Sequence, residues 1–249
     1  DMADIIEGKR PVVEALRTGV PMKCVLLGDY VKKDGLVEDI LRKAKRADVP
    51  VKLVPRRTLD ERSERGSHQG VLAQAKPFGY VGIGEIVDAA ARLTAERDGR
   101  ALVVILDHIT DAGNFGAIAR SAETVGACGL VIPNKRSARV EASTYKSSAG
   151  AIAHLPVAQV SNLVQTMMRL KEEGFWIAGA TEHASDVIWD VNLKGKIALV
   201  MGNEQEGLSR LVMEHCDLLA KLPVEGEVAS LNVAQAATAC MYEWLRQNR

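Results

Sequence analysis

Three stretches of the sequence combine glycine with side chains that could do chemistry, and each follows an apolar run. The first, LDHITDAGNFGAIARSAETVGA, carries Asn114 and, six residues later, Arg120. A helix that starts here would offer free backbone N–H groups and the positive end of its dipole, which suit a phosphate or another anion. A turn built on Asn and Gly, with the arginine in a surface salt bridge, is the alternative explanation.

The other two stretches lie in the last third of the chain. VMGNEQEGLSRLV places Glu204 just after Gly202, where a missing side chain would let the backbone approach a ligand closely. ASLNVAQAATACMYEWL places Ser230 and Asn232 at the start of a helical pattern. The alternatives are structural: Glu204 or Glu206 as the cap or first-turn acid of a helix, and either polar residue of the last stretch as an ordinary N-cap.

Alternating apolar runs and helical patterns would position these stretches at one edge of a sheet. Near-continuous apolar strands separated by helices are typical of a parallel sheet covered on both faces, so the predicted fold class is α/β. Ligands of such sheets bind outside the carboxyl ends of the strands. The predicted strands are 101–107, 129–133, 176–180, 197–202 and 218–223, and the predicted helices are about 84–97, 116–125 and 233–247.

The front of the chain has the pattern of a separate small α/β unit. Four Pro and Gly residues within KPFGYVGIGE interrupt any regular period. We therefore predict domains at 1–76 and 84–249 with a linker at 77–83; a surface loop inside one domain is the alternative. In the first domain we predict strands at 24–28, 51–54 and 70–75, and helices at 11–16, at 36–44 and from Thr58 onward.

The formal net charge is zero, with 32 Lys and Arg against 32 Asp and Glu. Residues 1–76 nevertheless hold 16 of the basic and 12 of the acidic residues, a surplus of four positive charges. Residues 77–249 hold 16 basic and 20 acidic residues, a deficit of four. A basic front domain joined to an acidic second domain indicates a division of labour, in which the front domain suits a polyanionic partner.

Several classes of function find no support. No run reaches the roughly 18 apolar residues of a membrane helix. The four cysteines are too far apart for a disulfide scaffold or a CxxC zinc site, and the five histidines show no metal-ligand spacing. We therefore expect a reduced, cytoplasmic protein without a metal. The GxxxxGK[ST] phosphate loop and the Rossmann glycine fingerprint are missing, and ten aromatic residues argue against a base-stacking sheet.

Taken together, the three stretches resemble the three motifs of the SpoU (TrmH-type) family of RNA ribose 2′-O-methyltransferases, in the SPOUT superfamily, and they occur in that family's order. IIEGKRPVVEAL and SHQGVLAQAKP in the front domain resemble the RNA substrate-binding domain of the branch that methylates a guanosine of 23S ribosomal RNA. The resemblance implies a small L30e-like domain followed by a parallel-sheet SPOUT methyltransferase domain with a deep carboxy-terminal trefoil knot. It also implies S-adenosylmethionine as the cofactor and a homodimer that pairs through the knotted domains.

The same resemblance assigns roles to particular residues. The first motif's functional pair is Asn114 and Arg120, the second motif's acid is Glu204, and the third motif's polar pair is Ser230 and Asn232. These five form the predicted catalytic set. The positions predicted to contact the cofactor, largely through their backbone, are Ala180, Thr181, Gly202, Leu222 and Leu231.

The reaction so implied is attack of a ribose 2′-hydroxyl on the sulfonium methyl group. A guanidinium with a pKa above ~12 is a poor proton acceptor, so we expect Arg120 to stabilise developing alkoxide and to hold a phosphate rather than to act as the base. Asn114 and Asn232 would position the ribose and the loop, Glu204 would fix Arg120 or the loop, and Ser230 would contact the nucleotide or the loop. The candidate phosphate contacts in the front domain are Lys9, Arg10, Arg56, Arg57, Arg62 and Arg65.

Three other interpretations stay open at this point. A sister enzyme would act on a different nucleotide of ribosomal RNA, including those of the antibiotic-resistance type, or on tRNA. A catalytically silent RNA-binding module would keep the fold without turnover. A small-molecule α/β enzyme would use a nucleotide cofactor, although the missing phosphate-loop fingerprints argue against it.

Overall fold

The computed structural model describes residues 5–249 and divides the chain into two units. The first unit comprises the described chain up to Gly79 together with Val140–Ala153; the second comprises Tyr80–Arg139 and His154–Arg249. The chain therefore crosses from one unit to the other three times. No pattern in the sequence indicates that residues 140–153 group with the front unit. Residues 1–4 of the predicted first domain lie outside the described residues.

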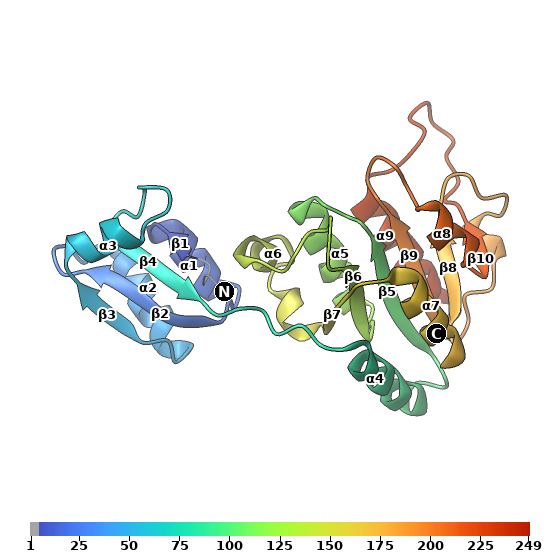
Figure 1. Cartoon of the computed structure of the whole chain (residues 1–249), viewed down its shortest axis with the longest axis horizontal. Helices are drawn as coiled ribbons and strands as arrows, with labels where there is room; N and C mark the ends of the chain where they lie inside the picture. Colours follow the sequence, from blue (N-terminus) through green and yellow to red (C-terminus); the bar gives the residue numbers. More distant parts are fainter. Residues whose placement is uncertain (1–4) are drawn as a thin grey trace. The chain divides into compact units, whose positions relative to one another are not determined.

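The first unit contains a four-stranded sheet in the order β1-β4-β2-β3, in which only β2 and β3 run parallel (Figure 1). Cys24, Leu26, Leu59 and Leu72 form a buried cluster that fixes one helix against the sheet. The elements of this unit are β1 (Ile5–Glu7), α1 (Lys9–Arg17), β2 (Met22–Gly28), α2 (Gly35–Arg46), β3 (Val51–Val54), α3 (Arg56–Arg62), β4 (Val71–Ala75) and α6 (Ala142–Ser147).

The second unit contains a six-stranded sheet in the order β10-β8-β9-β5-β6-β7, and every neighbouring pair is parallel. The predicted parallel α/β sheet is thus confirmed. Its elements are α4 (Ile83–Glu96), β5 (Ala101–Asp107), α5 (Ala112–Thr124), β6 (Gly129–Pro133), β7 (Val157–Val160), α7 (Leu163–Glu172), β8 (Trp176–Ala180), β9 (Lys196–Gly202), α8 (Arg210–Glu214), β10 (Leu218–Ala220) and α9 (Val233–Gln247), with a short 3₁₀ turn at Ile188–Asp190. A second 3₁₀ turn, Ala151–His154, lies where the chain passes from the first unit into the second.

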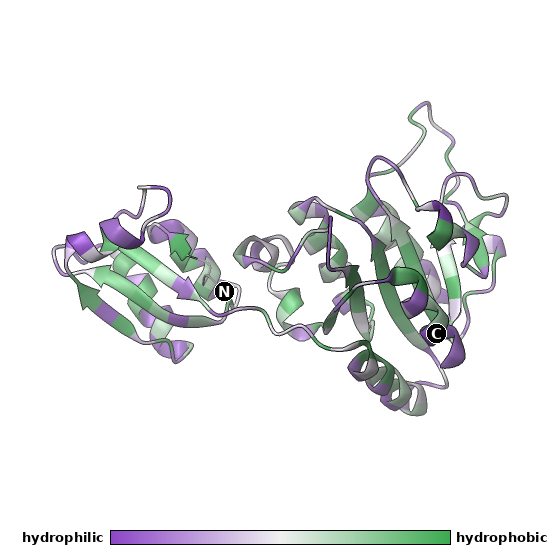
Figure 2. Ribbon diagram, in the orientation of Figure 1, coloured by the Kyte–Doolittle hydropathy of each residue, from purple (hydrophilic) through white to green (hydrophobic). Residues whose placement is uncertain are grey.

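The core of the second unit is centred on β5 and β9. All seven residues of β5 are buried, and only the first residue of β9 is partly exposed. Figure 2 shows these central strands as hydrophobic, with hydrophilic residues concentrated on the outer faces of the helices. Burial on both faces explains why the two strands are unbroken apolar runs in the sequence.

The carboxyl ends of four neighbouring strands meet at one edge of this sheet. Asp107, the last residue of β5, pairs in register with Gly202, the last residue of β9. Ala180, at the end of β8, pairs with Met201 of β9 and with Ala220 of β10. All three chemistry-bearing stretches leave the sheet at this edge, as the sequence predicted.

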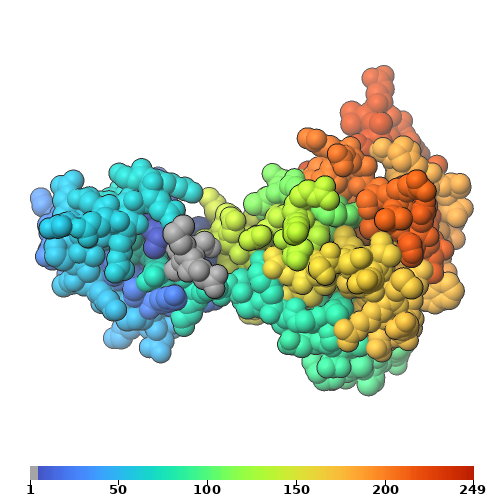
Figure 3. Space-filling model, viewed as in Figure 1, coloured from blue at the N-terminus to red at the C-terminus, as the bar shows by residue number. Residues whose placement is uncertain are grey.

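The last helix returns from the edge of the sheet to its middle. After the edge strand β10, residues 223–232 form an exposed loop that projects from the second unit (Figure 3). α9 then packs against α5 and β9. The contact with α5 includes a 2.6 Å hydrogen bond between the Ser121 and Thr238 hydroxyls, and Trp244 is 2 % exposed with its indole N–H donating to the Gly195 carbonyl at 3.3 Å.

Residues 5–249 hold neither a candidate membrane span nor a candidate metal cluster. None of the helices in these residues is both long enough and apolar enough to span a bilayer. Within the same residues, no three or more His, Cys, Asp or Glu side chains gather where they could hold a metal ion.

Candidate active site

Asn114 lies in the first turn of α5. The helix begins at Ala112, four residues before the predicted start, because the Asp111 side chain caps it by accepting a hydrogen bond from the Asn114 backbone N–H at 2.7 Å. Asn114 therefore belongs to a helix end rather than to the preceding loop. A side chain so placed is fixed by the helix and can bridge to neighbouring loops.

Glu204 ties the second motif to the first. One carboxylate oxygen accepts from the Asp111 N–H at 3.1 Å and from the Asn114 side-chain amide at 3.4 Å. The other accepts from the Thr110 N–H at 3.5 Å and from the Asn203 side-chain amide at 3.3 Å. Of the two predicted partners of Glu204, Arg120 and the loop, the structure shows the loop. The helix-cap alternative fails for Glu204, because α8 begins at Arg210 and its N-cap is Ser209.

Asn232 joins the third motif to the same network. Its side-chain amide N–H donates to the Asn114 oxygen at 2.9 Å. Its own oxygen caps α9 by accepting from the N–H groups of Ala234 at 2.9 Å and Gln235 at 3.3 Å. The N-cap alternative is thus confirmed for Asn232 and not for Ser230. Because both ends of the Asn114 amide are engaged, these two asparagines hold the three motifs together in this state.

Position 202 must be a glycine because the turn formed by Asn203–Gly207 leaves no room for a side chain there. A Cβ atom there would lie 2.3 Å from the Gly207 carbonyl carbon, because the loop folds back over the end of β9. The turn is closed by hydrogen bonds between the backbones of Asn203 and Gly207 at 2.9 and 3.0 Å. The Asn203 oxygen also accepts from the N–H groups of Gln205 and Glu206. The close approach that we expected from a ligand is made by the protein itself.

Asp107 is a site residue outside the predicted set. It is 1 % exposed, accepts from the Ser209 N–H at 2.6 Å and lies 2.7 Å from Nδ1 of His108. The Asn203 amide donates to the His108 carbonyl at 2.7 Å, so this hydrogen bond and that from Ser209 to Asp107 join the loops after β5 and β9 in addition to those of Glu204. The signal in the sequence was a carboxylate at the end of an otherwise apolar strand, which needs buried partners.

A cavity of about 490 Å³ lies beside this network, a size usual for small-molecule sites. Leu208, Met213 and Cys240 contribute to its apolar wall. Burial raises the pKa of the Cys240 thiol to about 12, so the thiol stays protonated and behaves as an apolar group. Glu204, Ser230 and all five positions predicted to contact the cofactor line the cavity: Ala180, Thr181, Gly202, Leu222 and Leu231.

The remaining predicted catalytic residues do not line this cavity. Asn114 is hydrogen-bonded to Glu204, which lines the cavity, and Asn232 is hydrogen-bonded to Asn114. Arg120 is exposed on α5, and no acceptor or carboxylate in residues 5–249 pairs with its guanidinium. The surface salt bridge that would have explained Arg120 without function is therefore not present in the described chain.

The six candidate phosphate contacts of the first unit fall into two groups. Three have carboxylate partners: Lys9 with Asp34 at 2.5 Å, Arg56 with Asp60 at 3.9 Å, and Arg57 with Glu61 at 2.7 Å. The other three are exposed and form no ion pair with the described part of the chain: Arg10, Arg62 and Arg65.

Comparison with known proteins identifies the family. Residues 101–242 match the SpoU rRNA Methylase family, and residues 5–81 match the family described as RNA 2′-O ribose methyltransferase substrate binding. The chain belongs to the SpoU rRNA methylase family. The resemblance read from the three motifs is thereby confirmed for the family, whereas the 23S ribosomal RNA guanosine branch stays a prediction.

Two relatives are similar over nearly the whole length of this SpoU-family chain. YacO of Bacillus subtilis (strain 168), whose name places it in the TrmH family of tRNA/rRNA methyltransferases, is 36% identical over 98% of this chain and 96% of its own length. A similarly named protein of Staphylococcus aureus (strain MSSA476) is 37% identical with the same coverage.

A solved structure shares the fold of both units. The SpoU methyltransferase AviRb from Streptomyces viridochromogenes, in complex with the cofactor AdoMet, superposes with a TM-score of 0.71 at 25% identity, over 99% of this chain and 90% of AviRb. An AdoMet-bound rRNA methyltransferase from Sinorhizobium meliloti has the same fold, with a TM-score of 0.68 at 23% identity over 98% of this chain and 87% of its own.

Proposed function

We propose that this protein transfers the methyl group of S-adenosylmethionine to a ribose 2′-hydroxyl of RNA, and that its target is a guanosine of 23S ribosomal RNA. The observation that carries the proposal is the cavity beside the hydrogen-bonded junction of the three motifs, in a chain of the SpoU rRNA methylase family. The second matched family, a substrate-binding domain of RNA 2′-O ribose methyltransferases, supports ribose as the acceptor.

The residues of the cavity fit S-adenosylmethionine, the cofactor present in the AviRb complex. Its adenosyl part needs an apolar wall, which Leu208, Met213 and Cys240 provide. Its charged amino acid part needs polar partners, which the backbone of Leu222 and the Ser230 side chain can offer because both residues line the cavity. When bound, this group supplies an electrophilic methyl on a sulfonium.

The protein's contribution to the transfer would be alignment and electrostatic stabilisation. The 2′-oxygen forms the new bond to the methyl carbon while the bond from sulfur breaks, and the hydroxyl proton leaves to solvent. Arg120 cannot take up that proton because guanidinium stays charged. Its exposed guanidinium, which has no ion-pair partner within residues 5–249, can stabilise the developing alkoxide or hold the adjacent phosphate. Glu204, Asn114 and Asn232 would act as positioning residues for this step.

A homodimer that completes the site with Arg120 of a second copy is part of the proposal. Its support is that Arg120 is exposed and lies outside the cavity lining of its own chain. Mixing Arg120→Ala with Gly202→Ala chains tests it, since each chain keeps what the other lacks. Random pairing would restore about a quarter of wild-type activity if the site is shared. No recovery in a confirmed mixed dimer would show that each chain supplies its own arginine.

The trefoil knot and the cytoplasmic location also stay predictions.

The nucleotide target needs a direct test. Ribosomal RNA and tRNA from cells with and without this protein are digested to nucleosides, and 2′-O-methylation is mapped by mass spectrometry. We expect one 2′-O-methylguanosine of 23S ribosomal RNA to disappear with the protein. The names of both relatives include tRNA, which favours tRNA as the second candidate, and loss of a tRNA methyl group instead would establish it.

A further inference from the structure

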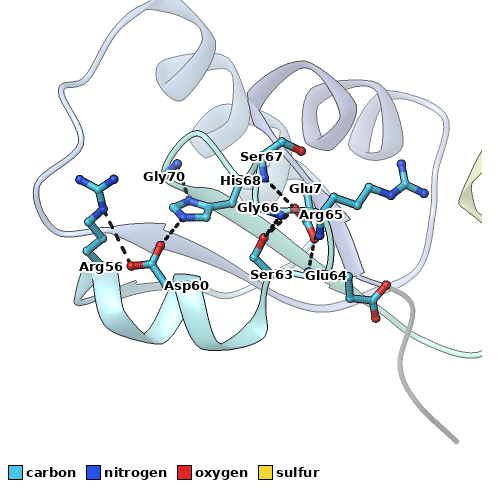
Figure 4. Close-up of polar contacts among 10 residues, drawn as sticks. All are labelled: Glu7, Arg56, Asp60, Ser63, Glu64, Arg65, Gly66, Ser67, His68 and Gly70. Atoms are coloured by element: carbon cyan, nitrogen blue, oxygen red, sulfur yellow. Dashed lines mark hydrogen bonds and ion pairs between the residues drawn. The ribbon is translucent and has the colours of Figure 1, made fainter.

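The loop after α3 is organised around the carboxylate of Glu7. This carboxylate accepts from the Ser63 hydroxyl at 2.8 Å and from the backbone N–H groups of Glu64 at 2.5 Å, Arg65 at 2.9 Å and Ser67 at 3.3 Å (Figure 4). Converging N–H groups of this kind form an anion-binding concavity. Here the anion comes from β1, a strand 56 or more residues away in sequence, so the loop's shape depends on one distant side chain.

The hydrogen bonds from the loop favour the charged form of the Glu7 carboxylate. Desolvation raises the pKa of Glu7, but the hydrogen bonds from Arg65, Ser63, Glu64 and Ser67 together outweigh it and leave the pKa below the ordinary glutamate value. The charged form of Glu7 is therefore the form that holds the loop at neutral pH.

The far end of the loop is fixed by His68, which is buried. The Gly70 N–H can only donate, so Nδ1 of His68 accepts from it at 2.9 Å, and Nε2–H donates to the Asp60 carboxylate at 2.9 Å (Figure 4). Gln69 has a left-handed backbone with φ 51°, which is costly for a residue with a side chain. Its side-chain oxygen accepts from the Lys9 N–H at 3.2 Å. The loop is thus held at both ends.

Two guanidinium groups are exposed here, one at the end of α3 and one on the loop that follows it. Arg62 ends α3 and Arg65 lies in the loop; both are exposed and neither forms an ion pair within residues 5–249. Figure 4 shows the Arg65 side chain pointing away from the carboxylate of Glu7 that binds its backbone. Arg56 and Arg57, earlier on the same helix, are paired with carboxylates instead.

We propose that Arg62 and Arg65 bind phosphates of the substrate RNA, and that Glu7 is the positioning residue that holds the loop for this contact. The inference rests on the proposed function, because it takes RNA as the substrate. Guanidinium pairs well with phosphate oxygens through two parallel hydrogen bonds. A loop that is already ordered loses little conformational entropy on binding, so its arginines bind more tightly than the same groups on a mobile loop would.

The test uses the full chain and a fragment of 23S ribosomal RNA, with affinity measured by fluorescence anisotropy across a series of KCl concentrations. The double variant Arg62→Gln with Arg65→Gln should reduce the slope of log affinity against log salt by about 1.4 to 1.8, since each lost phosphate contact removes about 0.7 to 0.9. An unchanged slope would overturn the assignment of these two arginines.

Glu7→Gln is compared with Glu64→Gln, which also removes one negative charge but does so at an exposed position on the loop itself. If only charge matters, both variants bind the polyanion more tightly. The proposal instead expects Glu7→Gln to bind RNA several-fold more weakly, with a raised KM for RNA, an unchanged kcat at saturating RNA and an unchanged affinity for S-adenosylmethionine. Equal behaviour of the two variants would refute the positioning role.

Two further measurements separate a folding failure and a failure of the proposed function from a failure of this inference. If thermal unfolding shows that Glu7→Gln fails to fold, Ser63→Ala, which removes one donor to Glu7, should show a smaller loss of RNA affinity in the same direction; wild-type affinity in that variant would count against the proposal. If the wild-type protein neither binds nor methylates RNA, the proposed function itself fails. If it methylates RNA while every variant binds normally, only this inference fails.

Discussion

Glu204→Gln replaces the carboxylate at the junction of the motifs by an isosteric amide. The carboxylate accepts from the N–H groups of Thr110 and Asp111 and from the side-chain amides of Asn114 and Asn203. A glutamine keeps one acceptor oxygen, and its NH₂ group faces two donors. The substitution therefore breaks two of the four hydrogen bonds and removes the charge that strengthens the rest.

The size of the effect follows from the geometry. Hydrogen bonds to charged groups contribute roughly 1.5–3 kcal/mol each, but three of these four lie between 3.3 and 3.5 Å, at the long end of the range. We therefore assign about 1–1.5 kcal/mol to each lost bond, or about 2–3 kcal/mol in total. If the loop must be in place for methyl transfer, kcat falls about 30- to 150-fold.

Single-turnover transfer of radiolabelled methyl groups to RNA measures this loss, and calorimetry measures the affinity for S-adenosylmethionine. Glu206→Gln is the matched control, because Glu206 lies two residues away, also lines the cavity and uses only its backbone N–H in the network. We expect the control to keep nearly full activity. Activity of Glu204→Gln within threefold of this control would show that methyl transfer does not depend on the Glu204 carboxylate.

Three further outcomes are expected. Gly202→Ala places a Cβ 2.3 Å from the Gly207 carbonyl carbon, so the turn that lines the cavity must shift. Calorimetry should therefore show loss of S-adenosylmethionine binding, and wild-type affinity would contradict the tight turn. Trp244→Ala empties a site that is 2 % exposed and should lower the free energy of unfolding by about 3–5 kcal/mol in urea titrations. The lowered pKa of Glu7 means that its stabilisation is present above the ordinary value of 4.5 and is lost as pH falls through the lower folded-state pKa. The stability difference between wild type and Glu7→Gln should accordingly vanish in acid, and a difference that persists there would contradict this cause.

The regular part of the fold could be predicted because its signals are local. β5 and β9 are unbroken apolar runs, and the helix at Val233–Gln247 was expected within a residue because Asn232 is a strong cap. β7 was missed because it is only four residues long and contains a glutamine. α5 was predicted four residues late because the glycines that follow Asp111 look like a turn until the cap is seen.

The geometry of the site depended on contacts that no local pattern contains. Glu204 meets Asn114 across 90 residues, and Asn232 meets Asn114 across 118. Side-chain type and motif order could place these residues at one edge of the sheet, but not show that they bond to one another. In the same way, Glu7 and its loop join residues more than 55 positions apart. Residues 140–153 group with the first unit for reasons that composition and periodicity do not reveal.

The most direct test of the proposed methyl transfer uses the purified protein of residues 1–249, with labelled S-adenosylmethionine and unmodified 23S ribosomal RNA. The RNA is digested to nucleosides and the position of the label is determined by mass spectrometry. We expect label on a ribose 2′-oxygen, and we expect that label to be lost with Arg120→Ala while S-adenosylmethionine still binds. Label on a base, or full transfer by Arg120→Ala, would contradict the proposed methyl transfer.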